Sequence, residues 1–362
     1  GEPLYRISRL PYANLRWEKT QTVNLGLDFN FFGGKVSAAV DYYNKRSRDL
    51  IVLQPVPYEN GVTQMPTNGG TLYNSGFEIA LNFIPVRTKD FTWTIGINSA
   101  KNFNKITSRQ IQNPIWNTAQ SGNLFKEGYA VSSFWVFDFT GVDSATGIPL
   151  FNLPTASIDP NAKFDATAFM KYAGKKNADI TGGFNTSIRY KSLTISSSIY
   201  ASVGNHKLLP NLYNVYMIRN TPYEYANLTK DLVNRWRQPG DNTITDIPSL
   251  PQATVGFLSI PSGSGTFDGQ SQGASETPYT LYNYSTARLV NASYLRVNNI
   301  AVNYIIPARI LKNIYSKTAS IGYSLSNVYT WVSKDYKGVD PEVASGSQPL
   351  PKVHSINLGI TF

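Results

Sequence analysis

The sequence predicts an all-β fold, a transmembrane antiparallel β-barrel of about eleven strands. Several stretches alternate apolar and polar residues with period two, which is the pattern of a strand with one apolar face. Charged residues make up only 15% of the chain and aromatic residues 13%, with 23 tyrosines, a composition typical of proteins that contact a membrane interface. Short and long connections also alternate along the chain, as they do in outer-membrane barrels.

The first predicted hairpin shows the pattern most clearly. Its first strand alternates five apolar with four polar residues: Val23, Leu25, Leu27, Phe29 and Phe31 against Asn24, Gly26, Asp28 and Asn30. Gly33-Gly34 predicts a two-residue turn, because glycine accepts the positive φ that hairpin turns need. The second strand, 35–53, is longer than a membrane crossing requires, so we expect it to project beyond the surface.

Later strands follow the same rule. We predict them at Phe77–Phe83, Phe91–Ile97, Phe184–Tyr190, Leu193–Ile199, 291–306 and Ala319–Leu325, with a weaker pair near 128–140 and 147–153. Residues 205–290 interrupt the rhythm with a Pro-, Gly-, Ser- and Asn-rich segment and one short helix at Leu228 to Trp236. A loop of that length is usually functional, and we interpret it as a long extracellular loop.

The last strand ends the chain on an aromatic residue. Within Lys352 to Phe362, the residues Ile356, Leu358, Ile360 and Phe362 alternate with Asn357, Gly359 and Thr361. About 9–11 residues of this kind cross a membrane as a tilted strand. The ending resembles the C-terminal strand that bacterial barrel proteins present to their insertion machinery, so these four apolar residues are the candidate insertion signal.

The connections predict the orientation of the barrel. Short ones fall at 33–34, 85–90, 141–146, 190–192 and 307–317, and long ones at 54–70, 107–127, 154–178, 205–290 and 332–351. With the short side periplasmic, the long loops are extracellular, the C-terminus is periplasmic and the polar positions of the strands face the lumen. Eleven is an odd number that leaves two open edges, and open edges do not occur in hydrocarbon. Either a strand is missed, or the chain is half a barrel.

Other classes of protein find little support. The formal net charge of +10 is spread without a long basic run, so we expect no nucleic-acid partner. The chain has no cysteine and only two histidines, His206 and His354, and it lacks the common catalytic motifs. Asp340 and Glu342 flank Pro341, and we interpret them as residues of a turn in preference to a catalytic acid–base pair. We therefore predict no enzyme activity, no metal and no cofactor.

Several motifs in order resemble one family, the SusC-like or RagA-type TonB-dependent outer-membrane transporters of Bacteroidetes. They are Leu15-Arg16-Trp17-Glu18-Lys19-Thr20, Asn24 to Phe29, Asp41-Tyr42-Tyr43, Asn74 to Glu78, Glu127-Gly128-Tyr129, Arg235-Trp236 with Pro239-Gly240-Asp241, Ser293 to Ile300, Tyr336 to Glu342, and the terminal strand. Each motif is weak alone, but together they run across essentially the full chain.

The resemblance implies a 22-stranded barrel, of which eleven strands are roughly half, so that residues 1–362 are its C-terminal part. It also implies an N-terminal plug and a TonB-contacting segment, neither of which lies in these residues. Import of oligosaccharides, or of peptides in some members, is the implied function. The implied partners are a SusD-like surface lipoprotein, the TonB complex, the remainder of the barrel with its plug, and outer-membrane lipid.

Aromatic residues in the predicted long loops are the candidates for substrate binding. Their rings could stack on a ligand, and the candidates are Trp116, Tyr213, Tyr216, Tyr223 and Trp236. The alternative is that they pack loops together or contact the lipoprotein. Trp17, Trp93 and Trp331 lie near strand ends and are read as membrane-interface residues.

Two functions of other classes stay open at this stage. One is a soluble or surface glycan-binding all-β module, and the other is a small passive porin. In a soluble module the apolar strand faces would point into a core, whereas in a barrel they would point at lipid.

Overall fold

The structure is a computed structural model of the chain. It describes residues 12–56, 59, 61–62, 64–108, 121–153, 166–213, 228–251, 256, 258–259, 275–311, 316–337, 340–344 and 347–362.

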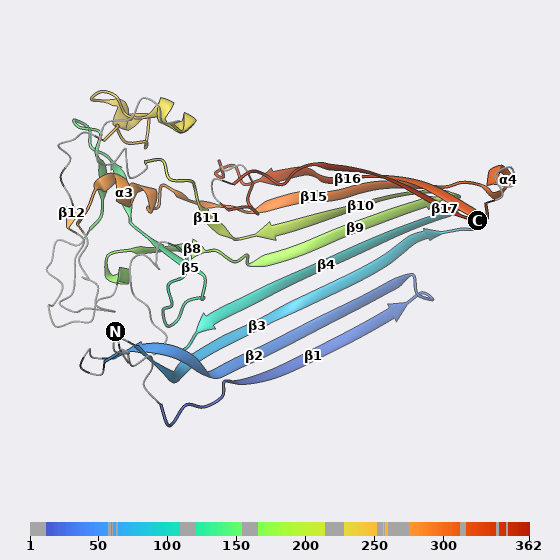
Figure 1. Cartoon of the computed structure of the whole chain (residues 1–362), viewed down its shortest axis with the longest axis horizontal. Coiled ribbons are helices and arrows are strands. Elements are labelled where there is room, and N and C mark those ends of the chain that lie inside the picture. The colour runs from blue at the N-terminus through green and yellow to red at the C-terminus, as the bar shows by residue number, and fades with distance from the viewer. Residues whose placement is uncertain are drawn as a thin grey trace, which may run out of the picture.

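One long antiparallel sheet dominates the molecule, with its strands side by side in Figure 1. Its nine strands follow one another in chain order, with the short strands of the loop layer skipped. They are β1 (Lys19–Phe31), β2 (Val36–Pro55), β3 (Gln64–Arg87), β4 (Phe91–Ile106), β9 (Ile180–Tyr190), β10 (Leu193–Val203), β15 (Tyr294–Ile305), β16 (Thr318–Val332) and β17 (Val353–Thr361). β1 and β17 are the two edges, and among the described residues neither has a partner strand on its outer side.

The alternation of the sequence becomes two chemically different faces. Leu25 pairs with Tyr42 and Leu27 with Val40, so the apolar residues of neighbouring strands share one face, which we call the outer face. Its side chains are exposed, Leu27 at 63% and Leu358 at 73%. An exposed apolar surface this continuous is rare on soluble monomers, where such patches usually cover a few hundred Å².

Aromatic residues mark both ends of the outer face. At the short-turn end, Trp93 on β4 donates from Nε1 to Thr186 Oγ1 at 3.0 Å. At the other end, Trp331 contacts Tyr329 with a centroid distance of 4.7 Å. From Trp93 to Phe103, the last outer aromatic residue of β4, the strand rises about 33 Å. At a tilt of about 40° this gives about 25 Å of height, the apolar band of a membrane barrel.

Tight connections join the strands at one end of the sheet. Phe32, Gly33 and Gly34 all have positive φ in the β1–β2 turn, which is why glycine stands there, and Lys191 has φ of 50° in the β9–β10 turn. The β3–β4 turn and the short helix α4 (Ala308–Leu311) lie at the same end as the C-terminus (Figure 1). Four of the five predicted short connections are therefore confirmed.

The fifth, 141–146, does join two short paired strands, but these do not belong to the long sheet. The count of eleven crossing strands is wrong, because the described residues place nine strands in that sheet. Residues 133–151 form strands of three or four residues that belong to separate small sheets: β5 (Ser133–Val136) with β8 (Lys171–Lys175), and β6 (Phe139–Val142) with β7 (Pro149–Phe151). All four residues of β5 are buried, so it has no lipid-facing side. The predicted loops 107–127 and 154–178 are consequently parts of one connection between β4 and β9.

These short elements form a loop layer beyond the long-loop end of the sheet (Figure 1). It also holds β11 (His206–Leu208) paired with β14 (Leu289–Asn291), β12 (Leu258–Ser259) paired with β13 (Ser275–Glu276), α3 (Pro278–Asn283), and the 3₁₀ turns η3 (Ala166–Ala168), η4 (Lys230–Asn234) and η5 (Asp241–Thr243). The helix predicted at 228–236 is thus a single 3₁₀ turn. Among the described residues, no helix is long and apolar enough to cross a membrane.

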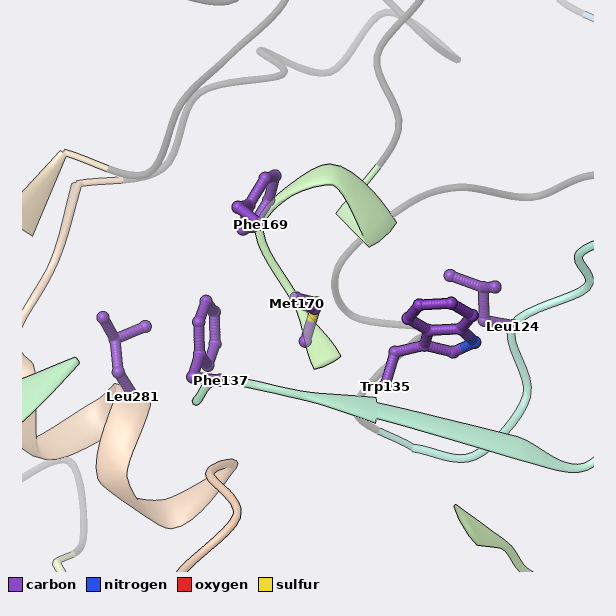
Figure 2. Close-up of a cluster of buried hydrophobic side chains, with 6 residues drawn as sticks. All are labelled: Leu124, Trp135, Phe137, Phe169, Met170 and Leu281. Carbon is purple, nitrogen blue, oxygen red and sulfur yellow. The ribbon is translucent and has the colours of Figure 1, made fainter. Parts of the chain in front are cut away.

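The hydrophobic core of the protein lies in this layer. Figure 2 shows one cluster, in which Phe137 and Phe169 stack with their centroids 6.2 Å apart and Leu281 of α3 lies beside them. Thr277 caps α3, because its hydroxyl accepts from the N–H of Thr280, and Pro278 is the first residue of the helix. The layer is therefore a packed domain-like body that rests on the end of the sheet.

Candidate functional site

The inner face of the sheet is polar. Asp28, Asp41 and Glu78 lie on this face of β1, β2 and β3, whereas the part that lines a cavity farther along the sheet carries no charge. A shallow cavity of about 540 Å³ crosses β3, β4, β9, β10 and β15 there. Its lining residues are all uncharged, namely Asn82, Thr94, Gly96, Asn185, Thr186, Ser187, Ser196, Ser197, Ser198, Asn299 and Ala301. Among them, Thr186 and Ser197 hold outer-face positions in the register. Hydroxyl and amide groups offer hydrogen bonds without fixing a charge, which suits contact with a hydrated cargo or with polar protein surface.

At the loop-layer end of the inner face, a β-bulge in β15 places a charged residue among the polar ones. Ser198 pairs with Asn299 but Ile199 pairs with Val297, so Asn298 is the extra residue on β15. Unbroken alternation from Asn299 would turn Val297 inward. The bulge reverses the parity, so that Arg296 takes the position opposite Tyr200 on the inner face and Val297 stays on the outer face.

Arg296 holds two carboxylates at the end of the sheet. Its Nη2 lies 2.6 Å from Asp340 Oδ1, and its Nε lies 3.0 Å from Glu342 Oε2 without the alignment of a hydrogen bond. The side chains of Arg296 and Asp340 are only 3% and 7% exposed. Tyr294 donates to the other oxygen of Glu342 at 2.5 Å. We call these four residues the Arg296 tether.

The Arg296 tether connects the nine-stranded sheet, which we call the wall, with the loop layer. Lys207 of β11 points its Nζ at the backbone carbonyls of Pro341, at 3.2 Å, and Val343. Burial lowers the pKa of Lys207, and Asp340 opposes that shift. Tyr336 donates to the carbonyl of Asp340 at 2.9 Å. Asp340 and Glu342 therefore stand in a turn that is fixed by cations and are not arranged as a catalytic pair.

Hydrogen bonds keep Asp340 ionised despite its burial. Burial alone would raise the pKa of this carboxyl. The backbone N–H groups of Glu342 and Leu350 and the Arg296 guanidinium all donate to it, and together they hold its pKa below the usual range. The turn is thus stabilised by a charge that acid would remove.

A second cavity, of about 420 Å³, opens beside the tether where the wall meets the loop layer. Asn102 of β4, Tyr200 of β10, Asn205, Asp179 and Glu342 contribute to its lining. Amide, carboxylate and phenol groups converge here, which is the polar complement that orients a bound ligand.

The candidate binding aromatics are not brought together in this cavity. Tyr213 is fully buried and donates to the carbonyl of Pro248 at 2.7 Å, and burial raises the pKa of its hydroxyl. Trp236 is 8% exposed and lies against Gly147, where a Cβ would meet its ring. Both side chains pack loops together and leave no face for a ligand. Trp116, Tyr216 and Tyr223 lie outside the described residues.

The residues that line the cavities could not be predicted from the sequence. Asn, Ser and Thr at the polar positions of strands are ordinary, and only the shared register brings Asn82, Asn185 and Asn299 to one surface. Arg296 carried one usable signal, since an arginine between Leu295 and Val297 is costly unless it faces away from lipid.

The C-terminal apolar residues lie where the alternation predicts. Ile356, Leu358, Ile360 and Phe362 are exposed by 56–73% on one side of β17. Their role as an insertion signal stays a prediction. Among the described residues, no three His, Asp or Glu side chains gather as metal ligands would.

Comparison with known proteins places this geometry in context. The family model for the TonB dependent receptor-like β-barrel matches residues 3–304. The TonB-dependent receptor SusC of Bacteroides thetaiotaomicron is 30% identical over 381 residues, an alignment that covers 100% of this chain and 34% of that protein. TonB-dependent receptor P3 of Formosa agariphila is 28% identical and is covered over 31% of its length, against 91% of this chain. The chain therefore spans about a third of the length of these relatives.

Solved structures show the same wall. A structure of the RagAB peptide importer in its closed-closed state superposes with a TM-score of 0.74 at 25% identity, over 98% of this chain and 37% of that one. A structure of the RagAB peptide transporter gives 0.71 at 24% identity, over 96% of this chain and 36% of that one. The first of these superpositions covers 98% of the chain, whereas the family model ends at residue 304, before β16 and β17.

Proposed function

This chain belongs to the TonB-dependent receptor-like β-barrel family, and from that premise we propose that it forms part of the wall of an outer-membrane importer. The long loops would face the cell exterior and the C-terminus the periplasm. A SusD-like lipoprotein would cover the loop layer. The TonB complex would supply energy through the N-terminal part of the transporter, and the cargo would be an oligosaccharide or a peptide.

One observation supports this function above the others: the apolar face of the nine-stranded sheet is exposed while its polar face lines cavities. In a soluble glycan-binding sandwich the apolar face would be covered by a second sheet, and none of the described residues covers it. A self-contained porin would need β1 to pair with β17. These strands are instead the two ends of the sheet order.

On this proposal, the remaining wall and the plug would come from further strands and a further domain. Nine strands are fewer than half of the 22 that the resemblance implies. The part of the inner surface that lines the cavity of about 540 Å³ carries hydroxyls and amides and no charge, which suits contact with a polar plug or a sliding cargo.

Intact-mass measurement under denaturing conditions tests this proposal. The protein is extracted from its native outer membrane in mild detergent, and every associated polypeptide is weighed. We expect a covalent parent of larger mass, or a tightly held second chain that carries the plug, together with a lipoprotein. A solitary 40.1 kDa chain that behaves as a closed barrel, or a protein that needs no detergent, would overturn it.

A further inference from the structure

We propose that a third cavity, within the loop layer, binds the charged termini of short zwitterionic peptides. This inference rests on the importer function proposed above and assigns its cargo to one chemical class, peptides with free amino and carboxyl ends.

The cavity has the size of a small-ligand site. Its volume is about 510 Å³, within the range of about 300–1,000 Å³ that is usual for ligand pockets. It lies between β6, the segment around η4 and η5, the approach to β14, and the turn after β16. Leu209, Ile247 and Tyr282 provide apolar lining.

Charged side chains of both signs line this cavity and do not pair with one another. Asp231 and Asp246 come from the η4–η5 segment, whereas Lys334 and Lys337 come from the turn that follows β16. Asp335 lies beside these lysines. Within the described part of the chain, none of the five forms an ion pair. Two different parts of the chain thus contribute carboxylates and mainly ammonium groups to the lining.

Arg288 adds a buried cation that lacks a counter-ion. Its side chain lines the cavity, the residue is 5% exposed, and one guanidinium nitrogen donates to the carbonyl of Pro210. Its Nε has no hydrogen-bond partner among the described residues, and no carboxylate there lies within ion-pair distance. Burial lowers the pKa of Arg288, while the more distant Asp231 opposes that shift. A ligand carboxylate would supply the missing negative charge.

The same lining disfavours neutral sugars. Sugar sites rely on exposed aromatic faces, yet Tyr282 is 2% exposed, meets Phe139 edge-on at 5.2 Å and donates its hydroxyl to the carbonyl of Asp246. Burial raises the pKa of Tyr282 to about 12, so it stays neutral. The polar side chains left for a ligand are mostly charged, and a neutral sugar would have to desolvate them without returning a charge.

Binding to the full-length receptor, purified in detergent with any partner that stays attached, tests this assignment. Isothermal titration compares trialanine, its N-acetylated form, its C-terminal amide and maltotriose. We expect trialanine to bind and each blocked terminus to weaken binding about tenfold, which corresponds to about 1.4 kcal/mol. Maltotriose should not bind to this cavity.

Paired substitutions then locate the two ends of the ligand. Lys334→Gln with Lys337→Gln should weaken trialanine about tenfold but leave its amide unaffected, because the amide has already lost the carboxylate. Asp231→Asn with Asp246→Asn should weaken trialanine about tenfold but leave the N-acetylated form unaffected, because that form has already lost the ammonium group. All but Asp231 are exposed, so folding should be preserved. Lys89→Gln in the β3–β4 turn is the matched control and should change nothing.

The outcomes separate this proposal from the function on which it rests. Trialanine and its blocked forms binding equally, maltotriose binding alone, or affinity insensitive to both paired substitutions would each overturn the peptide assignment. If TonB-dependent uptake of some other cargo persists in that case, the importer stands. If trialanine binds as expected but no TonB-dependent uptake of any substrate occurs, the importer fails and the cavity stands.

Discussion

Replacing Arg296 with methionine should release the turn that carries Lys334, Lys337 and Asp340 from the barrel wall. The change removes the only cation within ion-pair distance of Asp340 among the described residues, and both side chains are almost fully buried. Removing one partner of a buried ion pair costs about 3–5 kcal/mol, because the other charge stays behind without compensation. Asp340 keeps two backbone N–H donors, from Glu342 and Leu350, so we expect the lower end, about 3 kcal/mol.

Limited trypsin digestion measures this loss, since Lys334 and Lys337 lie in the tethered turn. When opening is fast relative to cleavage, the cleavage rate follows the open population. A loss of about 3 kcal/mol should therefore raise cleavage at these lysines about 100-fold. Glu342→Gln should have a smaller effect, because this carboxylate is 33% exposed and therefore partly solvated.

The control is Arg189→Met, which removes an exposed arginine from the short-turn end of β9. Its only side-chain contact described is with Thr92, so cleavage at Lys337 should stay unchanged. If Arg296→Met increased cleavage no more than Arg189→Met does, the tether would not be what holds the turn.

Three further predictions concern the charge of the turn and the faces of the sheet. The pKa of Asp340 is lowered in the folded state, so its carboxylate stabilises the turn above the unfolded pKa, near 3.9, and this stabilisation is lost as the pH falls through the lower folded pKa. Because trypsin is inactive in acid, pepsin digestion should show the turn opening there. Asp340→Asn should flatten that pH dependence. Leu27→Arg on the outer face should destabilise the assembled barrel by about 2–4 kcal/mol, whereas Asn24→Arg on the inner face should not, as heat-induced mobility shifts on electrophoresis would show; equal shifts would mean that the faces are misassigned. Phe362→Ser should lower the fraction of protein assembled in the outer membrane, measured after fractionation, while Thr361→Ser should leave it unchanged; assembly unaffected by Phe362→Ser would remove the insertion role.

The wall of the barrel was predictable because each strand there has a single lipid-facing side. Leu25, Leu27 and Phe29 alternate with polar residues since one face meets lipid and the other does not, and that contrast is written in period two. Gly33 and Gly34 marked their turn because positive φ is costly for other residues. The face assignment followed from the alternation. Of the four short turns, only 33–34 carried the glycine signal, and the other three are the gaps between alternating strands.

The loop layer was not predictable by the same rules. β5 is buried on both sides, so Ser133 to Val136 show no alternation that could separate a short layer strand from a crossing strand. The buried aromatic residues of the layer could not be told from ligand-binding ones for a related reason. A tyrosine in a polar loop can stack on a ligand or fill a core, and only its neighbours decide, as Pro248 does for Tyr213.

The bulge at Asn298 shows how one residue joins the two regions. By reversing the parity of β15 it turns Arg296 inward, and Arg296 then holds Asp340 and the turn that Tyr336 also contacts. The same turn carries Lys334 and Lys337, the cationic wall of the loop-layer cavity. Since the apparent affinity of a site falls with the fraction of molecules in which its walls are in place, the tether and the cavity should be thermodynamically linked. A ligand held by those lysines would in turn stabilise the tethered turn, so that occupancy of the loop layer is communicated to the barrel wall through a single arginine.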